Sequence, residues 1–433
     1  MLKVFIWSGS GSEHKICAYQ STIIFNFFKE NNYNLVKSPI NADLIILNWY
    51  PFEEFEEKIN LLTINYYLIK YSSAKIILTG SIPWMMPYLN KLERVKLIWL
   101  KNLNKFDDDY KVNVSINDIV VDNVKFFVPL NLESLNIDKY WYSWMNIESK
   151  YNFLESDYKI TLEQVKSWEY GLWKIFEYDT EKYSYLEDLS WEYPIEICTW
   201  CWWFCSYCDI RNVAGFVKSL PLDLVVKKIK RGISLWYKEF HFIDEDSASY
   251  WLDLWIDFAD LLNNINKIDW DFKIKIFYFE PWRLEKLFEK IDISLWKKII
   301  NFCVPLQTTS QRILKLMNRK YNINNVINIS NKIRSYNKNI IITTQFIYWF
   351  PSETFDEFKD YFKMLNYYDE LWFWYYSDRL WTKSVNFNLK ISKKELSKRM
   401  VFLWKIKERY IERVFDKNQT LKIWLNIINS RKF

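Results

Sequence analysis

The second half of the chain repeats one pattern six times: a short apolar run followed by an amphipathic stretch. The apolar runs have the length and the β-branched and aromatic content of buried strands, and they fall at 194–198, 238–243, 273–279, 299–304, 339–347 and 371–376. The run at 299–304 fits a helix as well as a strand. The intervening stretches have helical spacing and fall at 222–235, 252–266, 284–290, 309–317, 323–335 and 354–366.

Strands that alternate with helices in this way form a parallel sheet covered by helices. Six such repeats predict a partial (β/α)6 barrel of the TIM type, whose active site lies at the carboxyl ends of its strands. A second, shorter alternation begins the chain, with apolar runs at 2–6, 44–47, 75–78 and 97–100 and helix-like stretches at 17–30 and 53–71. It predicts a Rossmann-like α/β domain.

The chain therefore divides into four expected parts. Residues 1–130 are the small α/β domain, and 131–192, which are rich in Tyr, Glu and Ser with one helix-like stretch at 161–177, are a linker or insertion. Residues 193–390 are the barrel, and 391–433 are a basic helical tail.

Composition restricts the class of protein. In 433 residues, 50% are hydrophobic and 26% are charged, which is typical of a globular protein. The net charge of +6 is scattered along the chain, so it permits a nucleic-acid partner without arguing for one. No apolar run approaches the roughly 18 residues of a membrane span, and the N-terminus turns polar too early for a signal peptide. We expect a cytoplasmic protein with no membrane partner.

The glycine content is far below normal. Gly occurs 6 times and Trp 24 times, whereas Gly alone usually makes up about 7% of a protein. Many of the Trp stand at turn positions, where a residue without a Cβ is favoured: Trp200, Trp202, Trp203, Trp251, Trp349 and Trp381. We hypothesise that most of them are glycines in the native organism, which would read UGA as Gly. The alternative is a protein that is truly rich in Trp.

Four of the six cysteines lie between residues 198 and 208, in CTWCWWFCSYC. Cys201, Cys205 and Cys208 have the spacing C-x3-C-x2-C directly after the first barrel strand, and three thiolates this close can hold one metal centre. A four-iron cluster held by three ligands keeps one iron open for chemistry. The alternative is a zinc site that also uses Cys198, but Cys198 ends an apolar strand and no second Cys pair follows at zinc-ribbon spacing.

This loop resembles that of the radical S-adenosylmethionine (radical SAM) enzymes. Further motifs are similar to those of the methylthiotransferase family in order and spacing: IDEDSASYW at 243–251, VPLQTTSQRILKLMNRKY at 304–321, TTQFIYWFPSET at 343–354 and YYSDRLWT at 375–382. NADLIILNWY at 41–50 and IILTGSIP at 76–83 are similar to the N-terminal domain of that family.

The resemblance implies that Cys201, Cys205 and Cys208 hold a 4Fe-4S cluster. It also implies that S-adenosylmethionine binds the open iron and is cleaved by one electron to a 5′-deoxyadenosyl radical. The implied substrate is a tRNA base or a ribosomal-protein residue, and the implied electron donor is a flavodoxin or ferredoxin.

Acidic residues follow the second barrel strand. Asp244, Glu245 and Asp246 are expected to receive the ammonium group of S-adenosylmethionine in a charge-assisted contact. The alternative is that they are solvated loop carboxylates.

Other polar residues follow later strands. Gln307 and Ser310 are expected to bond the ribose or carboxylate of the cofactor, and Arg319 or Arg379 to pair with that carboxylate. For the two arginines the alternative is a surface salt bridge. The backbone at Trp349, if this residue is a native glycine, could approach the adenine edge.

The chain departs from the family in two ways. Three N-terminal cysteines that hold a second cluster in methylthiotransferases are matched here by Ser12, Tyr50 and Ser81, and Cys17 alone cannot hold a cluster. Only about 20 residues follow the last expected helix, too few for the family's RNA-binding barrel. Two alternatives follow: a radical SAM enzyme of another outcome without sulfur insertion, or an inactive scaffold, which would be expected to lose the three cysteines.

Overall fold

The protein divides into two compact units, Met1–Asp188 and Leu189–Phe433. The computed structural model describes residues 1–8, 15–49, 64, 67–68, 70–85, 87–129, 183–187, 192–199, 201–210, 215–250, 253, 256–379, 382–392, 394–395, 398–399 and 401–402. Ser12, Tyr50, Trp200, Trp251, Trp381, the expected helix at 161–177 and most of the stretches 53–71 and 393–433 lie outside these residues. Among the described residues, no helix is long and apolar enough to cross a bilayer.

The first unit contains a five-stranded parallel sheet. Its strand order is β2-β1-β3-β4-β5, with bounds Asn34–Leu35, Lys3–Ser8, Leu44–Trp49, Lys75–Gly80 and Val95–Leu97. Helix α1 (Lys15–Glu30) contributes Phe27 and Phe28 to a core on one face of the sheet, and Tyr67 belongs to a separate core on the other face. Both faces are thus buried, as the apolar strands require, and the expected Rossmann-like α/β arrangement is confirmed.

Shorter elements complete this unit. They are helices α3 (Ile82–Met85) and α4 (Lys105–Asp109) and an antiparallel pair formed by β6 (Lys125–Pro129) and β7 (Tyr183–Glu187). Strand β7 lies within the segment 131–192 that was expected to link the domains.

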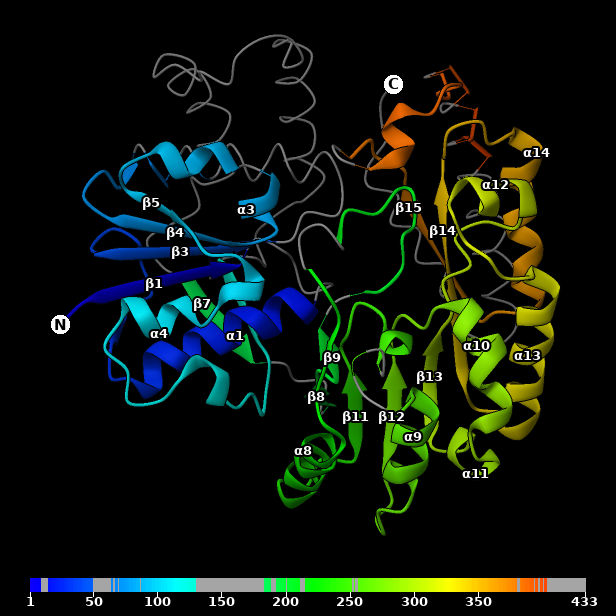
Figure 1. Ribbon diagram of the computed structural model, residues 1–433, viewed down its shortest axis with the longest axis horizontal. Helices are drawn as coiled ribbons and strands as arrows, with labels where there is room; N and C mark the ends of the chain where they lie inside the picture. Colours follow the sequence, from blue (N-terminus) through cyan, green and yellow to red (C-terminus); the bar gives the residue numbers. More distant parts are fainter. Residues whose placement is uncertain are drawn as a thin grey trace. The chain divides into compact units, whose positions relative to one another are not determined.

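The second unit contains a six-stranded sheet in which all strands are parallel and follow chain order (Figure 1). The strands are β8 (Glu192–Ile195), β11 (Glu239–Phe242), β12 (Lys273–Ile276), β13 (Ile299–Cys303), β14 (Ile341–Tyr348) and β15 (Glu370–Tyr375). The ambiguous run at 299–304 is therefore a strand. Six β/α repeats in one direction confirm the expected open, TIM-like barrel architecture.

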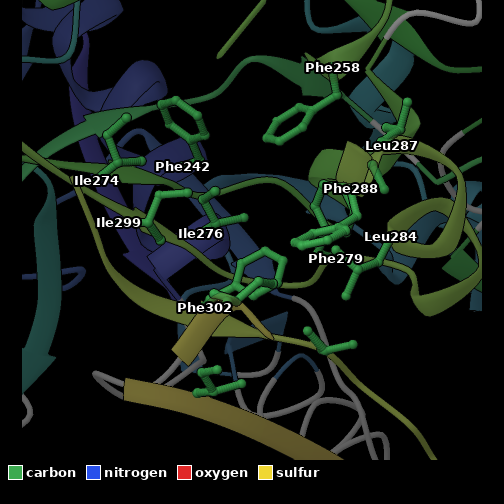
Figure 2. Packing of buried hydrophobic residues seen from close by; sticks show 14 of the residues in the cluster. Phe242, Phe258, Ile274, Ile276, Phe279, Leu284, Leu287, Phe288, Ile299 and Phe302 are labelled. Carbon is green, nitrogen blue, oxygen red and sulfur yellow. The ribbon is translucent and has the colours of Figure 1, made fainter. Parts of the chain in front are cut away.

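Helices cover the outer face of this sheet (Figure 1). Their bounds are α8 Leu222–Ser234, α9 Phe258–Asn266, α10 Pro281–Leu287, α11 Ile293–Trp296, α12 Gln311–Leu316, α13 Ile323–Tyr336 and α14 Phe355–Asp360. The stretch expected to be helical from 252 begins only at Phe258, because the side chains of Asp257 and Asp260 form a reciprocal capping box there. Figure 2 shows the apolar side chains of strands and helices packed between the two layers.

The opposite face of the same strands carries polar residues. Lys275 on β12 bonds Glu192 on β8 (2.6 Å) and Glu239 on β11 (2.7 Å), and His241 Nδ1 lies 3.0 Å from Glu192. These residues alternate along each strand with core residues such as Phe240 and Ile274. The barrel interior is therefore polar at the amino ends of its first three strands, which leaves the carboxyl ends for the functional site.

Candidate metal and cofactor site

The cysteine-rich segment begins with a short strand. Cys198 lies in β9 (Cys198–Thr199), which pairs antiparallel with β10 (Lys218–Ser219), and not in the first barrel strand as the sequence predicted. Its side chain is 2% exposed and donates to the carbonyl of Asp246 (Sγ to O, 3.6 Å). Cys198 thus packs as a small hydrophobe, whereas Cys201, Cys205 and Cys208 are half-buried in the loop that follows.

This loop is anchored by segments far away in the sequence. The backbone N–H of Ser206 donates to the carbonyl of Met317 (3.0 Å), and the carbonyl of Ser206 accepts from the N–H of Ser384 (2.9 Å). Asn318 Nδ2 donates to the carbonyl of Phe204 (2.8 Å). The loop conformation therefore depends on the end of α12 and on the segment after β15.

The three half-buried thiols influence one another. Burial raises the pKa of Cys201 first, and Asp246, Cys205 and Cys208 raise it further. Burial, Asp209 and Cys205 raise the pKa of Cys208. A bound cation would oppose these effects by stabilising the thiolates. The thiols therefore act on one another electrostatically, and burial disfavours their charged form.

The donor set fits a 4Fe-4S cluster. Among the described residues, no three His, Cys, Asp or Glu side chains converge closely enough to hold a single metal ion. A four-iron cluster takes each thiolate on a different iron, so its ligands stand farther apart than those around one ion. Because Cys198 is directed away into the core, three thiolates remain, and these are the residues that would hold the cluster.

Arg319 contacts the cysteine loop from the end of α12. Its Nη1 donates to Sγ of Cys205 (3.3 Å), and its Nη2 donates to the carbonyl of Pro305 (2.9 Å) and lies 3.2 Å from Oε1 of Glu280. Both side chains of the ion pair are 5% exposed. The alternative of a surface salt bridge is thus wrong for Arg319.

The first acidic residue after β11 binds the backbone of the cysteine segment. Asp244 Oδ1 accepts from the N–H groups of Ile197 (2.7 Å) and Cys198 (3.1 Å), and its Oδ2 accepts from Ser247 Oγ (3.0 Å). Burial raises the pKa of Asp244, and the backbone bonds oppose that rise. Asp244 therefore connects the carboxyl ends of the first two barrel strands.

Asp246 contacts the cysteine loop through a side chain. Its Oδ1 accepts from the N–H groups of Ala248 (3.2 Å) and Glu280 (3.0 Å), and its Oδ2 accepts from Trp203 Nε1 and Ser249 Oγ, both at 2.7 Å. Asp246 is 3% exposed, so neither it nor Asp244 is a solvated loop carboxylate. Glu245 between them is half-buried.

Gln307 and Ser310 follow β13. Gln307 has a left-handed backbone (φ 65°), donates its N–H to the carbonyl of Gln345 (2.6 Å), and is bridged to the neighbouring β14. Its Oε1 is buried, and no described residue hydrogen-bonds it. Ser310 caps α12 by accepting from the N–H of Ile313, and its hydroxyl donates to Glu357 (2.6 Å). Ser310 thus already has protein partners, whereas Gln307 offers an acceptor.

Trp349 and Arg379 follow β14 and β15. Trp349 has φ 74°, and its indole donates to the carbonyl of Ile391 (3.1 Å). The adjacent Phe350 packs edge-to-face on Tyr207 of the cysteine loop, with 6.4 Å between ring centroids. Arg379 is 5% exposed, so a surface salt bridge is wrong for it as well.

The sequence reasoning missed three residues of this site: Glu280, Trp203 and Ser249. Glu280 caps α10 by accepting from the N–H groups of Trp282 (2.6 Å) and Arg283 (3.4 Å), and Pro281 follows at the first helical position. An acidic residue before a proline at the end of the third strand was a visible signal, because that end of a barrel carries the site. Nothing in the sequence indicated that Trp203 and Ser249 would share Asp246.

Comparison with known proteins agrees with this geometry. Residues 195–365 match the radical SAM superfamily. The ribosomal protein uS12 methylthiotransferase RimO of Dictyoglomus thermophilum is 32% identical over 214 residues, which are 48% of each chain. The tRNA-2-methylthio-N(6)-dimethylallyladenosine synthase of Clostridium tetani is 32% identical over 184 residues, or 41% of this chain and 40% of the other. The present chain thus matches about half the length of these relatives.

A solved structure gives the same fold. The radical S-adenosylmethionine methyltransferase TsrM of Kitasatospora setae, with cobalamin and a [4Fe-4S] cluster bound, superposes with a TM-score of 0.50 at 11% identity, covering 87% of this chain and 72% of that one. The parallel sheet, the three-cysteine loop at the carboxyl end of its first strand and the matching sequence profile lead to one conclusion. Residues 195–365 form a radical SAM domain, similar in sequence to the radical SAM domains of methylthiotransferases.

Proposed function

We propose that this protein is a radical SAM enzyme with one 4Fe-4S cluster held by Cys201, Cys205 and Cys208. The observation that carries the proposal is the separation of the four neighbouring thiols into one core residue, Cys198, and three half-buried residues on a loop. When bound, the cluster supplies the electron that cleaves S-adenosylmethionine to a 5′-deoxyadenosyl radical. The electron donor is a flavodoxin or ferredoxin.

The residues of the chain bind and orient the reactants. Asp246, which accepts a hydrogen bond from Trp203 of the cysteine loop, is the carboxylate proposed to receive the ammonium group. Gln307 offers a buried acceptor for a ribose hydroxyl, Arg379 is a candidate for the cofactor carboxylate, and the backbone at Trp349 could meet the adenine edge. Asp244 and Ser310 hold the strand ends and α12 in place, which fixes the positions of the binding groups.

The proposed substrate is a tRNA base or a ribosomal-protein side chain. The support is that the matched relatives are named for ribosomal protein uS12 and for tRNA adenosines. Ser81, at one of the positions that carry cluster cysteines in methylthiotransferases, is buried and donates to the carbonyl of Trp49 (3.3 Å), so that position supplies no thiolate. A radical outcome without sulfur insertion is therefore the second candidate. Comparing tRNA nucleosides and ribosomal-protein masses with and without the gene distinguishes the two.

Anaerobic reconstitution tests the cluster. The wild-type chain should bind about four irons and release 5′-deoxyadenosine when it is reduced with S-adenosylmethionine present. Cys205→Ala should lose both properties, while Cys198→Ala, a matched change of the core thiol, should keep its iron. Zinc without iron in the wild type would contradict the proposal, and iron near eight would show a second cluster.

A further inference from the structure

Arg319 reaches the cysteine loop because α12 ends in a left-handed turn. The helix stops at Leu316, Asn318 adopts φ 58°, and the N–H of Arg319 returns to the carbonyl of Leu314 (2.8 Å). Asn is one of the few side chains that tolerate this backbone conformation. The turn reverses the direction of the chain and brings Arg319 to the end of the barrel that holds the cysteine loop. A continued helix would carry this residue away from it.

The guanidinium group of Arg319 is held on two sides. Glu280 at the start of α10 pairs with Nη2 at 3.2 Å, the carbonyl of Pro305 accepts from the same nitrogen at 2.9 Å, and Nη1 is left pointing at Sγ of Cys205, 3.3 Å away. The ion pair is buried, and Glu280 itself is fixed by the N–H groups of its helix. Arg319 is therefore a rigid donor to one sulfur of the loop.

We infer that Arg319, oriented by Glu280, is a positioning residue that raises the reduction potential of the cluster through an N–H···S bond to Cys205; this inference rests on the proposed cluster. A hydrogen bond to a ligating sulfur and a nearby positive charge both stabilise the reduced cluster, which carries one more negative charge. Glu280 offsets part of the charge effect while keeping the donor in place. The two members of the pair therefore act on the potential in opposite directions.

The test measures the midpoint potential and the electron paramagnetic resonance spectrum of the reconstituted full-length chain. Arg319→Met removes the donor and the charge, so the potential should become more negative by at least about 59 mV, a tenfold change in the one-electron equilibrium. Arg319→Lys should fall between Arg319→Met and the wild type. Glu280→Gln leaves the arginine charge uncompensated and should shift the potential to a more positive value. Arg312→Met, on the exposed side of α12, is the matched control and should leave it unchanged.

Opposite shifts in the two variants support the inference, because a purely structural pair would lower iron content in both without moving the potential in opposite directions. An Arg319→Met protein with four irons and the wild-type potential overturns it. If that variant holds no iron, the Glu280→Gln potential decides, and an unchanged value overturns it too. Loss of iron in both variants assigns the pair to folding and also overturns the inference. A wild-type chain without iron would instead refute the proposed function.

Discussion

The indole of Trp203 donates a hydrogen bond to Asp246, with 2.7 Å between Nε1 and Oδ2. The bond uses one oxygen of the carboxylate that we propose for the cofactor ammonium. The ring of Trp203 also packs edge-to-face on Trp282, with 5.4 Å between centroids. A bulky residue thus occupies the approach to Asp246 from the cysteine loop.

Trp203→Gly is therefore expected to strengthen the binding of S-adenosylmethionine to the reconstituted protein. Freeing one charged acceptor is worth about 1.5–3 kcal/mol, which is a change of roughly tenfold or more in Kd measured by calorimetry. Trp203→Phe keeps the ring but removes the donor, so it should give a smaller gain. Weaker binding by the glycine variant than by the wild type would contradict this prediction.

Trp236 stands in a glycine position at the end of α8. Its φ is 67°, its side chain is 81% exposed, and the N–H of Tyr237 bonds the carbonyl of Gly232 across it at 3.0 Å. This is the Schellman arrangement, in which the left-handed residue is usually Gly.

Trp236→Gly should raise the free energy of unfolding by about 1 kcal/mol, because the left-handed conformation strains any residue with a Cβ. Trp236→Ala is the control, since it removes the indole but keeps the Cβ, and the glycine variant should be the more stable of the two in urea unfolding. Peptide masses of the protein from its native host should show Gly at this position. Trp there would refute the hypothesis that UGA is read as glycine.

Glu353 and Arg399 form a buried ion pair whose side chains are 0% and 1% exposed. The N–H of Trp349 and the hydroxyl of Tyr361 also donate to Glu353. Arg399→Met would leave a buried carboxylate without its charge partner and should cost about 3–5 kcal/mol of unfolding free energy. Lys332→Met breaks an exposed pair with Glu289 and should cost less than about 1 kcal/mol.

The cost of Arg399→Met should depend on pH. Burial raises the pKa of Glu353 to about 7 even though Arg399 opposes the rise, and removing Arg399 raises it further. A carboxyl group whose folded-state pKa is raised loses stability as pH rises above its unfolded value near 4.5, because the unfolded chain releases the proton first. The variant should therefore be weakened more at pH 8 than at pH 5 relative to wild type, as measured by thermal unfolding. Equal losses at the two pH values would contradict this.

Glu357 should make stability depend on pH in the opposite direction from Glu353. Burial alone would raise its pKa, but hydrogen bonds from Arg312, Ser310 and the N–H of Thr354 lower the pKa to about 2. A depressed folded-state pKa gives stability that is present above about 4.5 and is lost as pH falls towards 2. Glu357→Gln should flatten the thermal stability curve in this window, and a variant curve parallel to the wild-type curve would show that Glu357 is not responsible.

The sequence predicted the barrel well because its strands and helices have the spacing of local, periodic elements. Each of the six strand runs overlaps an observed strand, and only the helix versus strand choice at 299–304 needed the structure. Periodicity does not give the order in which strands pair. Consecutive β/α repeats nevertheless restrict a parallel sheet to few strand orders. Helix α9 begins at Phe258 and not at 252 because Asp257 and Asp260 cap it, and hydrophobic spacing does not reveal a cap.

The site was harder to predict, because its contacts join residues far apart in the chain. The spacing of Cys201, Cys205 and Cys208 identified the thiols. The acidic run 244–246 could be recognised because it directly follows the second barrel strand. The contact between Arg319 and Cys205 spans 114 residues, and no local pattern encodes it. Asp244 binds the backbone of the cysteine segment, whereas Asp246 faces Trp203. This difference depends on side-chain directions that cannot be read from the sequence.

The double attachment of Ser206 has a consequence for the order of events during synthesis. The three cysteines leave the ribosome well before Met317 and Ser384, the residues whose backbones hold their loop. The thiols of Cys201, Cys205 and Cys208 are therefore present for more than 170 residues of synthesis before Ser384, the last anchor of their loop, is made. Iron delivered during that interval would meet a loop without these two backbone bonds, so we expect the proposed cluster to be loaded after the sixth repeat has been made.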